Sequence, residues 1–221
     1  KAKLVIIDGE DKPVALLPGP YAVCRRETDG TDFSIPLPMA LPDELFQRIV
    51  SSDSNNKLFS IGFLGSIRKQ TEIRRFWLEK LGECYSDALL STSGAAYNPD
   101  HHTDGRVDLN SYYNNLQKCK IVLTLQGAGY DTLRFWENAA CNAVHVSEKT
   151  PLFIPNDFID GKHIIRFTEL DGLRRIIDYV LNNEQKVRII IENSRNHLQK
   201  YHLTTIRAVY FLDRIKKTFN A

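Results

Sequence analysis

Apolar residues recur along the chain in two alternating patterns from about Ser60 onward. Short apolar runs bounded by glycine or polar residues indicate strands, and longer stretches with apolar residues three or four positions apart indicate amphipathic helices. The predicted strands are Phe59–Leu64, Asp87–Leu90, Ile121–Leu125, Ala143–Val146 and His163–Phe167. The predicted helices are Thr71–Leu81, Leu109–Gln117, Thr132–Ala140, Leu170–Leu181, Glu184–Gln199 and Thr204–Thr218.

This alternation predicts an α/β fold with a mainly parallel sheet, helices on both faces and right-handed crossovers. Ligands of such sheets bind beyond the carboxyl ends of the strands. Gly65 follows the first predicted strand, and Gly127 and Gly129 follow the third. Both glycine turns are therefore expected at the same edge of the sheet, facing one crevice.

The first 57 residues follow a different pattern. Lys3–Asp11 predicts a strand that ends in an acidic turn, and Pro13–Pro42 is rich in proline, which favours a linker or irregular cover over a layer of the fold. We therefore divide the chain into a connecting segment, residues 1–57, and a ligand-binding domain, residues 58–221. Most acidic turns are exposed caps, so this one is a candidate acid or base only if it lies at an interdomain edge.

Composition narrows the class of protein. The 221 residues suit one well-buried domain with a small appendage, and 43% hydrophobic and 25% charged residues are typical of a soluble globular protein. Lys and Arg number 29 against 27 Asp and Glu, and the charges are interspersed, so nucleic acid is not an expected partner. No apolar run reaches the roughly 18 residues that span a bilayer, and no signal segment opens the chain. We expect a cytoplasmic protein, with the Golgi lumen as the alternative.

The cysteines support the cytoplasmic expectation. Cys24, Cys84, Cys119 and Cys141 are widely spaced, and nothing in the chain has metal-ligand spacing. Buried free thiols in a reducing compartment are therefore expected for all four. A Golgi enzyme could still pair two of them.

The stretch Val122–Val146 contains most of the candidate ligand-binding residues. After its glycine turn a helix is expected to open with Asp131 as N-cap and to carry Arg134 and Glu137 on one face, where they suit a diphosphate and a ribose diol. A solvated ion pair is the alternative, but the helix is otherwise largely apolar, which favours the crevice edge. Because an Asp131 cap competes with a phosphate for the first-turn amides, we assign the diphosphate to Arg134 and the glycine-turn amides rather than to the helix terminus.

These residues resemble a known family. The motif GAGYDTLRFWE, followed by Cys141 and AVHV, resembles the donor-binding motif of exostosin-like and spore-maturation-type glycosyltransferases. Phe63–Leu81 is similar to the strand, glycine loop and helix that open the C-terminal half of such enzymes, and His202–Ile215 is similar to their closing helix. The three segments occur in consistent order. The resemblance implies a Rossmann-like domain, the C-terminal half of a two-domain enzyme of the GT-B type.

The resemblance also implies that donor-binding residues come from both glycine turns and the helix that follows the second. These residues are Gly65, Ser66, Gln126, Gly127, Gly129, Tyr130, Asp131, Thr132, Arg134 and Glu137. Arg134 and Arg68 are implied as the catalytic residues that stabilise the leaving diphosphate, with no cofactor and no metal ion. For the loop after the first strand, an ordinary turn capped by Ser66 is an equally good interpretation.

Several other polar residues are expected to be structural. His101 and His102 lie in a polar loop, but adjacent histidines do not readily bind one ion from a regular element, so a surface loop is favoured over a metal site. Arg74 and Arg75 are expected on the solvent face of their helix. His202 is expected to pack or hydrogen-bond near the donor pocket.

We therefore predict a glycosyltransferase that transfers a sugar from a nucleoside diphosphate sugar, with UDP as the nucleotide, to a glycan or other acceptor. The resemblance implies an N-terminal domain, absent from this chain, that carries much of the acceptor site. Two alternatives stay open. A non-catalytic module of a larger protein would bind a nucleotide sugar or glycan without turnover, and a doubly wound interaction domain would bind no nucleotide.

Overall fold

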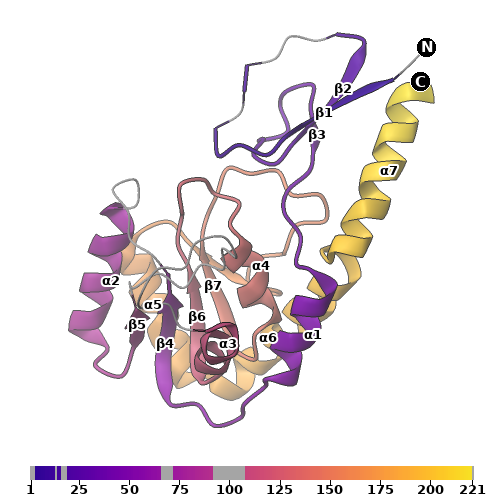
Figure 1. Cartoon of the computed structure of the whole chain (residues 1–221). Helices are drawn as coiled ribbons and strands as arrows, with labels where there is room; N and C mark the ends of the chain where they lie inside the picture. Colours follow the sequence, from indigo (N-terminus) through magenta and orange to yellow (C-terminus); the bar gives the residue numbers. More distant parts are fainter. Residues whose placement is uncertain (1–2, 13, 16–18, 66–71, 92–107, 221) are drawn as a thin grey trace.

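The computed structural model describes residues 3–12, 14–15, 19–65, 72–91 and 108–220. Within them the chain forms two parallel sheets, a large one of five strands and a small one of three (Figure 1). The large sheet has the order β5-β4-β6-β7-β8. Its strands are β4 (Phe59–Leu64), β5 (Leu89–Ser91), β6 (Cys119–Thr124), β7 (Val144–Glu148) and β8 (Ile165–Phe167). The helices that follow or connect them are α2 (Glu72–Cys84), α3 (Leu109–Gln117), α4 (Leu133–Ala140), α5 (Leu170–Asn182), α6 (Glu184–Tyr201) and α7 (Thr204–Asn220).

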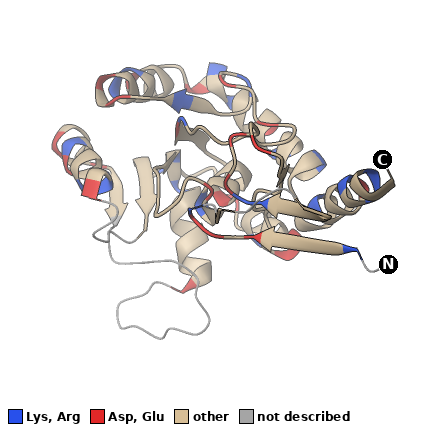
Figure 2. Ribbon diagram, turned by 90° about the horizontal axis from the view of Figure 1, so that it is seen from above, with Lys and Arg blue, Asp and Glu red and all other residues tan. Residues whose placement is uncertain are grey.

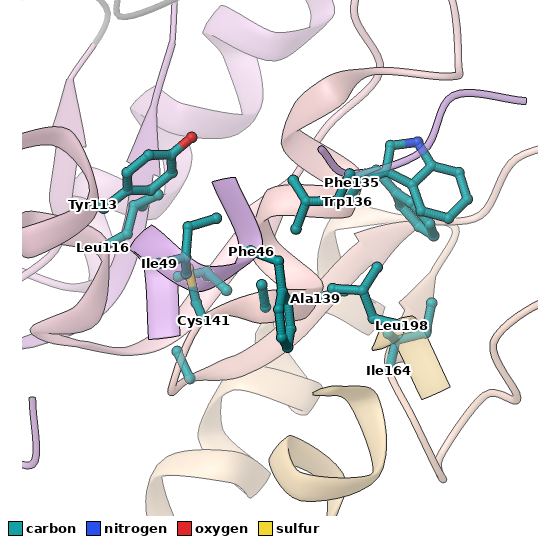
Figure 3. Packing of buried hydrophobic residues seen from close by; sticks show 14 of the residues in the cluster. Phe46, Ile49, Tyr113, Leu116, Phe135, Trp136, Ala139, Cys141, Ile164 and Leu198 are labelled. Atoms are coloured by element: carbon teal, nitrogen blue, oxygen red, sulfur yellow. The ribbon is translucent and has the colours of Figure 1, made fainter. Parts of the chain in front are cut away.

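Helices cover both faces of the large sheet, because successive strand residues point to opposite sides. In β6, Val122 packs with Leu116 of α3 and Trp136 of α4 in one apolar cluster. Ile121, its neighbour in the strand, packs with Trp77 of α2 in a second cluster on the other face. Figure 3 shows the first cluster at close range. The predicted α/β fold, with a parallel sheet and helices on both faces, is confirmed.

The small sheet lies beyond one end of the large sheet (Figure 1). It consists of β1 (Leu4–Asp8), β2 (Tyr21–Arg25) and β3 (Ile35–Pro36). Buried Ala22 and Cys24 form its core, against which apolar side chains of α7 pack. The prediction of an irregular, proline-rich segment is therefore wrong at β2 and β3, although the strand predicted near the N-terminus is confirmed.

A further helix, α1 (Asp43–Ser51), was not expected from the sequence. Phe46 and Ile49 are buried along it, and Leu45 and Val50 are partly buried on the same side. Phe46 and Ile49 join the apolar cluster of α3 and α4. Just before α1, the Leu41 backbone bonds to His202 and Thr204, so this part of residues 1–57 is fixed to the end of the chain.

All four cysteines are free. Cys24, Cys119 and Cys141 are buried as predicted, and burial raises the pKa of Cys24 to about 11 and of Cys119 to about 12. Cys84 is exposed at the last position of α2, so the prediction of burial is wrong there.

The surface carries both signs of charge over its outer helices (Figure 2). Among the helices of the described residues, none is long and apolar enough to cross a membrane.

Candidate functional site

Two arginines from different helices share one aromatic ring near the carboxyl end of β4. The Arg134 guanidinium of α4 lies 5.0 Å from the ring centroid of Phe63, and that of Arg74 from α2 lies 5.3 Å from it. Phe63 is fully buried in β4, so the ring is a fixed platform for both cations. The fold thus concentrates positive charge at the edge of the large sheet where ligands are expected.

Arg134 is held in place by the first glycine turn. Its Nε donates a hydrogen bond of 2.9 Å to the carbonyl oxygen of Leu64, the last residue of β4. A side chain at Gly65 would collide with the Arg134 guanidinium, so a larger residue there would displace Arg134 from its present position. The structure therefore brings together Gly65 and Arg134, two predicted site residues 69 positions apart in the sequence.

Arg74 is buried, and the prediction that it faces solvent is wrong. It is 4% exposed, and its guanidinium donates to the carbonyl oxygens of Gln126 at 2.7 Å and Leu125 at 3.3 Å. Burial, followed by the charge of Arg134, lowers the pKa of Arg74 to about 10. Arg75 is exposed and pairs with Glu72, as expected of a solvent-facing residue.

The second glycine turn is held together by its own backbone and by carboxylates. The Gly127 amide donates to the Gly129 carbonyl oxygen at 2.9 Å. The amides on either side of this turn bond to acids, Gln126 to Glu148 at 2.8 Å and Asp131 to Glu27 at 2.9 Å. Three amides that could have bound a phosphate are thus already engaged by protein oxygens.

Asp131 does not cap α4, so that prediction is wrong. Its carboxylate accepts from the backbone amide of Met39 at 2.6 Å and from the indole nitrogen of Trp136 at 2.9 Å. Desolvation raises the pKa of Asp131, and these two hydrogen bonds oppose that rise. The sequence could not show that Met39, 92 residues earlier, supplies a competing donor.

The N-cap of α4 is Thr132, and no side chain caps the helix. Its hydroxyl oxygen is buried without a hydrogen-bond partner among the described residues. The first-turn amides of α4 carry the positive end of the helix dipole and favour an anion. Because Asp131 does not occupy these amides, the reason for excluding the N-terminus of α4 from phosphate binding no longer holds. Arg134 lies in the first turn of this helix.

Glu137 lies one turn further along α4 and is only 6% exposed. Its carboxylate accepts from the hydroxyls of Tyr112 at 3.2 Å and Tyr113 at 2.6 Å. Burial raises the pKa of Glu137, while the Tyr113 hydrogen bond and the charge of Arg134 oppose that rise. The residue is not on an exposed edge, and its predicted contact with a ribose stays a prediction.

Sequence reasoning missed Glu27, which follows β2 and sits on the second glycine turn. Gly129 lies so close to Glu27 and Asp11 that any side chain there would collide with their carboxylates. Arg26 forms an ion pair with Asp11, which ties the acidic turn after β1 to the end of β2. The available signal was the charged triplet Arg25-Arg26-Glu27 directly after an apolar run.

The remaining predicted residues divide into two groups. Gln126, Tyr130 and Thr132 are half-buried around the second glycine turn, near Arg74 or α4. Ser66 and Arg68, like His101 and His102, lie outside the described residues. In the part of the chain that the structure describes, no group of three or more His, Cys, Asp or Glu residues is arranged to hold a metal ion.

His202 has a structural role at the junction of α6 and α7. Its Nε2 bonds to the carbonyl oxygen of Asn156 at 3.0 Å, and its Nδ1 accepts from Arg207 at 3.0 Å. Burial and the charge of Arg207 lower the pKa of His202 to about 3, so the ring is neutral. The closing motif thus anchors the loop that contains Asn156.

Comparison with known proteins assigns the chain to a family. The family profile described as glycosyl transferase-like matches residues 68–213 of the 221. The chain belongs to this glycosyl transferase-like family. A search of curated proteins gives no match. The exostosin or spore-maturation subtype stays a prediction.

Two solved structures share the fold. Sucrose-phosphate synthase from Thermosynechococcus elongatus is 13% identical with a TM-score of 0.54, covering 90% of this chain and 58% of the other. A glycosyltransferase from Rickettsia africae is 10% identical with a TM-score of 0.58, covering 89% and 63% respectively. The chain therefore spans about three fifths of the length of these structures.

Proposed function

We propose that this chain is the donor-binding part of a glycosyltransferase of the GT-B type that uses a UDP-sugar and transfers the sugar to a glycan acceptor. The observation that carries the proposal is the pair Arg74 and Arg134 on Phe63, beside the uncapped start of α4. Family membership supports the transferase class. The choice of UDP rests on the motif resemblance alone.

The paired arginines fit a diphosphate for an electrostatic reason. Burial and, after it, repulsion by Arg134 lower the pKa of Arg74, while the Glu148 carboxylate opposes part of that fall. A multiply charged anion offsets both effects at once, whereas a neutral sugar offsets neither. Arginine also presents several N–H donors to phosphate oxygens in a fixed planar geometry.

The same groups would act in the chemical step. The bond between the anomeric carbon and the diphosphate oxygen breaks, and its electron pair leaves with the diphosphate. An acceptor hydroxyl oxygen forms the new bond to the anomeric carbon and loses its proton to a base. Arg134, Arg74 and the α4 amides stabilise the charge that grows on the leaving group, which is the task a metal ion performs in other enzymes.

The acceptor site is proposed to lie on a second domain that packs against the small sheet. The chain spans 58% and 63% of the two structures that share its fold, which leaves length for such a domain. In β1, at the edge of the small sheet, Leu4 is 57% and Ile7 64% exposed. An exposed apolar strand edge is a surface that a further domain would cover.

A thermal-shift panel tests the proposal. UDP, GDP, CDP and ADP, each with its sugars, are compared with the free nucleosides, with and without EDTA. A ligand at one hundred times its dissociation constant adds about 2.7 kcal/mol of apparent stability. We expect UDP and UDP-sugars to stabilise the chain in EDTA and uridine to do so far less. If no nucleoside diphosphate stabilises it, the proposal is wrong. Donor binding without transfer or donor hydrolysis, even by a longer polypeptide that contains this chain, would favour the non-catalytic module.

A further inference from the structure

Two neighbouring tyrosines of α3 hold one buried carboxylate of α4. The Tyr113 hydroxyl donates to Glu137 Oε1 at 2.6 Å, and the Tyr112 hydroxyl donates to Glu137 Oε2 at 3.2 Å. The two tyrosine rings meet edge to face at 5.0 Å, and their residues are 3% and 0% exposed. Tyr113 lies at one end of the apolar cluster, beside Leu116 (Figure 3). Each oxygen of the carboxylate thus has its own donor.

Packing alone does not account for this arrangement. A buried carboxylate costs desolvation energy, and an apolar side chain of similar size is often as stable or more stable at such a place. Two hydroxyl donors from one helix also fix the rotation of the carboxylate, which an exposed acid would not require. Geometry of this kind suits a group that must present its oxygens in one orientation.

The carboxylate keeps acceptor capacity after both tyrosines have bonded. An ionised carboxylate has about four lone-pair positions, so one tyrosine on each oxygen leaves about one position on each oxygen. Two remaining positions, a fixed short distance apart, match two hydroxyls on adjacent carbons. The motif resemblance implies a ribose diol at Glu137, and these two acceptor positions match its two hydroxyls.

The position along α4 agrees with this ligand. Glu137 is three residues after Arg134, which is about 4.5 Å along a helix axis. Arg134 also lies close enough for its charge to oppose the rise in the pKa of Glu137. A nucleotide whose diphosphate contacts Arg134 carries its ribose a similar short distance away. The two side chains can thus contact neighbouring parts of one molecule.

We infer that Tyr112 and Tyr113 are positioning residues that orient the Glu137 carboxylate to accept the two hydroxyls of the donor's ribose, an inference that rests on the proposed function. Tyr113 makes the shorter hydrogen bond to Glu137, so we expect it to contribute more than Tyr112 to the orientation of the carboxylate. The tyrosines themselves do not contact the reacting atoms.

The test compares the affinities of UDP and 2′,3′-dideoxy-UDP, measured by calorimetry. The variants are Tyr113→Phe, Tyr112→Phe and, as a control, Tyr85→Phe, which removes a hydroxyl bonded to Asp178 at 2.8 Å between α2 and α5. We expect the parent to bind UDP more tightly than 2′,3′-dideoxy-UDP. In Tyr113→Phe the ratio of the two affinities should fall roughly three- to tenfold, the equivalent of one hydrogen bond. Affinity for the dideoxy compound should stay unchanged, and Tyr85→Phe should match the parent.

A pH series separates positioning from packing. The groups around Glu137 that act on its charge are Tyr112, Tyr113 and Arg134, with the Cys141 thiol also close to it. Because the Tyr113 hydrogen bond opposes the rise in the pKa of Glu137, its removal raises that pKa further. In Tyr113→Phe the preference for ribose should therefore disappear at a higher pH than in the parent.

The outcomes distinguish this inference from the proposed function. If the parent binds no nucleoside diphosphate, both fail. If the parent binds UDP with a ribose preference that Tyr113→Phe and Tyr112→Phe retain at every pH, the proposed function stands and the positioning inference is wrong. Should Tyr113→Phe not fold, Tyr112→Phe and the pH series on that variant decide the question in the same way.

Discussion

Arg74 and Arg134 each combine a charge with a contact to the Phe63 ring, and methionine separates the two contributions. We expect Arg134→Met and Arg74→Met each to weaken UDP binding by about 1.5–3 kcal/mol, the value of a charge-assisted hydrogen bond, and to change uridine binding little. Arg75→Met is the matched control, since Arg75 is the next residue in α2 and pairs only with exposed Glu72 among its charged neighbours in the described chain. Calorimetry with both ligands is the measurement. Equal losses for UDP and uridine would contradict the assignment of these residues to the diphosphate.

Sequence could find Arg134 but not Arg74, and the reason lies in the pattern of α2. Apolar Ile73 and Phe76 favour burial of their own side of the helix, yet they are 53% and 48% exposed. The buried side is that of Trp77, Leu78 and Leu81, and Arg74 lies on it because its guanidinium meets two carbonyl oxygens beyond β6 and the ring of Phe63. Those partners are distant in sequence, so the local pattern of residues does not predict these contacts. Arg134 belongs to the motif that follows a glycine turn, and this identifies it in the sequence as a candidate ligand-binding residue.

Gly129 leaves room for two carboxylates, and its substitution should displace them. Gly129→Ala places a methyl group against Glu27 and Asp11, so the Glu27 carboxylate must move away from the Asp131 amide, and loss of that hydrogen bond costs about 0.5–1.5 kcal/mol. Gly9→Ala is the control, since a methyl group there meets nothing within 4 Å. Urea unfolding of both variants measures the difference. If Gly129→Ala is as stable as Gly9→Ala, the contact of Glu27 with the second glycine turn does not contribute to stability.

At the scale of elements, two buried histidines, His202 at the junction of α6 and α7 and His145 in β7, should make stability depend on pH. Burial lowers the pKa of His202 and of His145 to about 3 each, while an unfolded histidine has a pKa of about 6.5. Between these values the unfolded chain binds protons that the folded chain does not, so stability is full above pH 6.5 and is lost as the pH falls toward 3. Each histidine contributes about 1.4 kcal/mol per pH unit inside that window.

His202→Gln tests this expectation. The variant should be less stable at pH 7, because the bonds to Asn156 and Arg207 are altered, but its stability should fall less steeply between pH 6.5 and 5. Urea unfolding at several pH values gives both quantities, and comparison with the parent removes the contributions of the other titrating groups. If stability falls with pH at the same slope in the parent and the variant, the pKa of His202 is not lowered in the folded state.

Most elements of the large sheet and its helices were predictable, because apolar runs and helical spacing are local properties. The prediction of β4 matches the observed Phe59–Leu64, and that of α3 matches Leu109–Gln117. The first 57 residues were harder for a physical reason. In β2 only a short apolar run separates prolines from a charged triplet, and α1 is a helix of nine residues with two buried side chains. Such short elements are fixed by α7 and α4 rather than by their own pattern.

At the scale of the molecule, two sheets meet over the second glycine turn. Glu27, just after β2 of the small sheet, bonds to the Asp131 amide, while α2 and α4 beside the large sheet carry the cations of Arg74 and Arg134. α7 extends from the large sheet to the small one and packs on β2 (Figure 1). The cations proposed to bind the diphosphate thus belong to the part of the chain around the large sheet, and we propose that the acceptor surface belongs to a further domain.

This division leads to a prediction about activity. We expect the isolated chain to bind a donor nucleotide and to transfer little or no sugar, because the proposed acceptor domain would supply the second substrate and the base. Donor binding should persist in EDTA, since Arg134 and Arg74 supply the positive charge that a divalent ion would otherwise provide. Transfer and donor-hydrolysis assays with and without EDTA, on this chain and on any longer polypeptide that contains it, are the measurement. Robust transfer by the isolated chain would contradict the need for a second domain. Loss of binding in EDTA would instead show that a metal ion, not the paired arginines, carries the charge of the diphosphate.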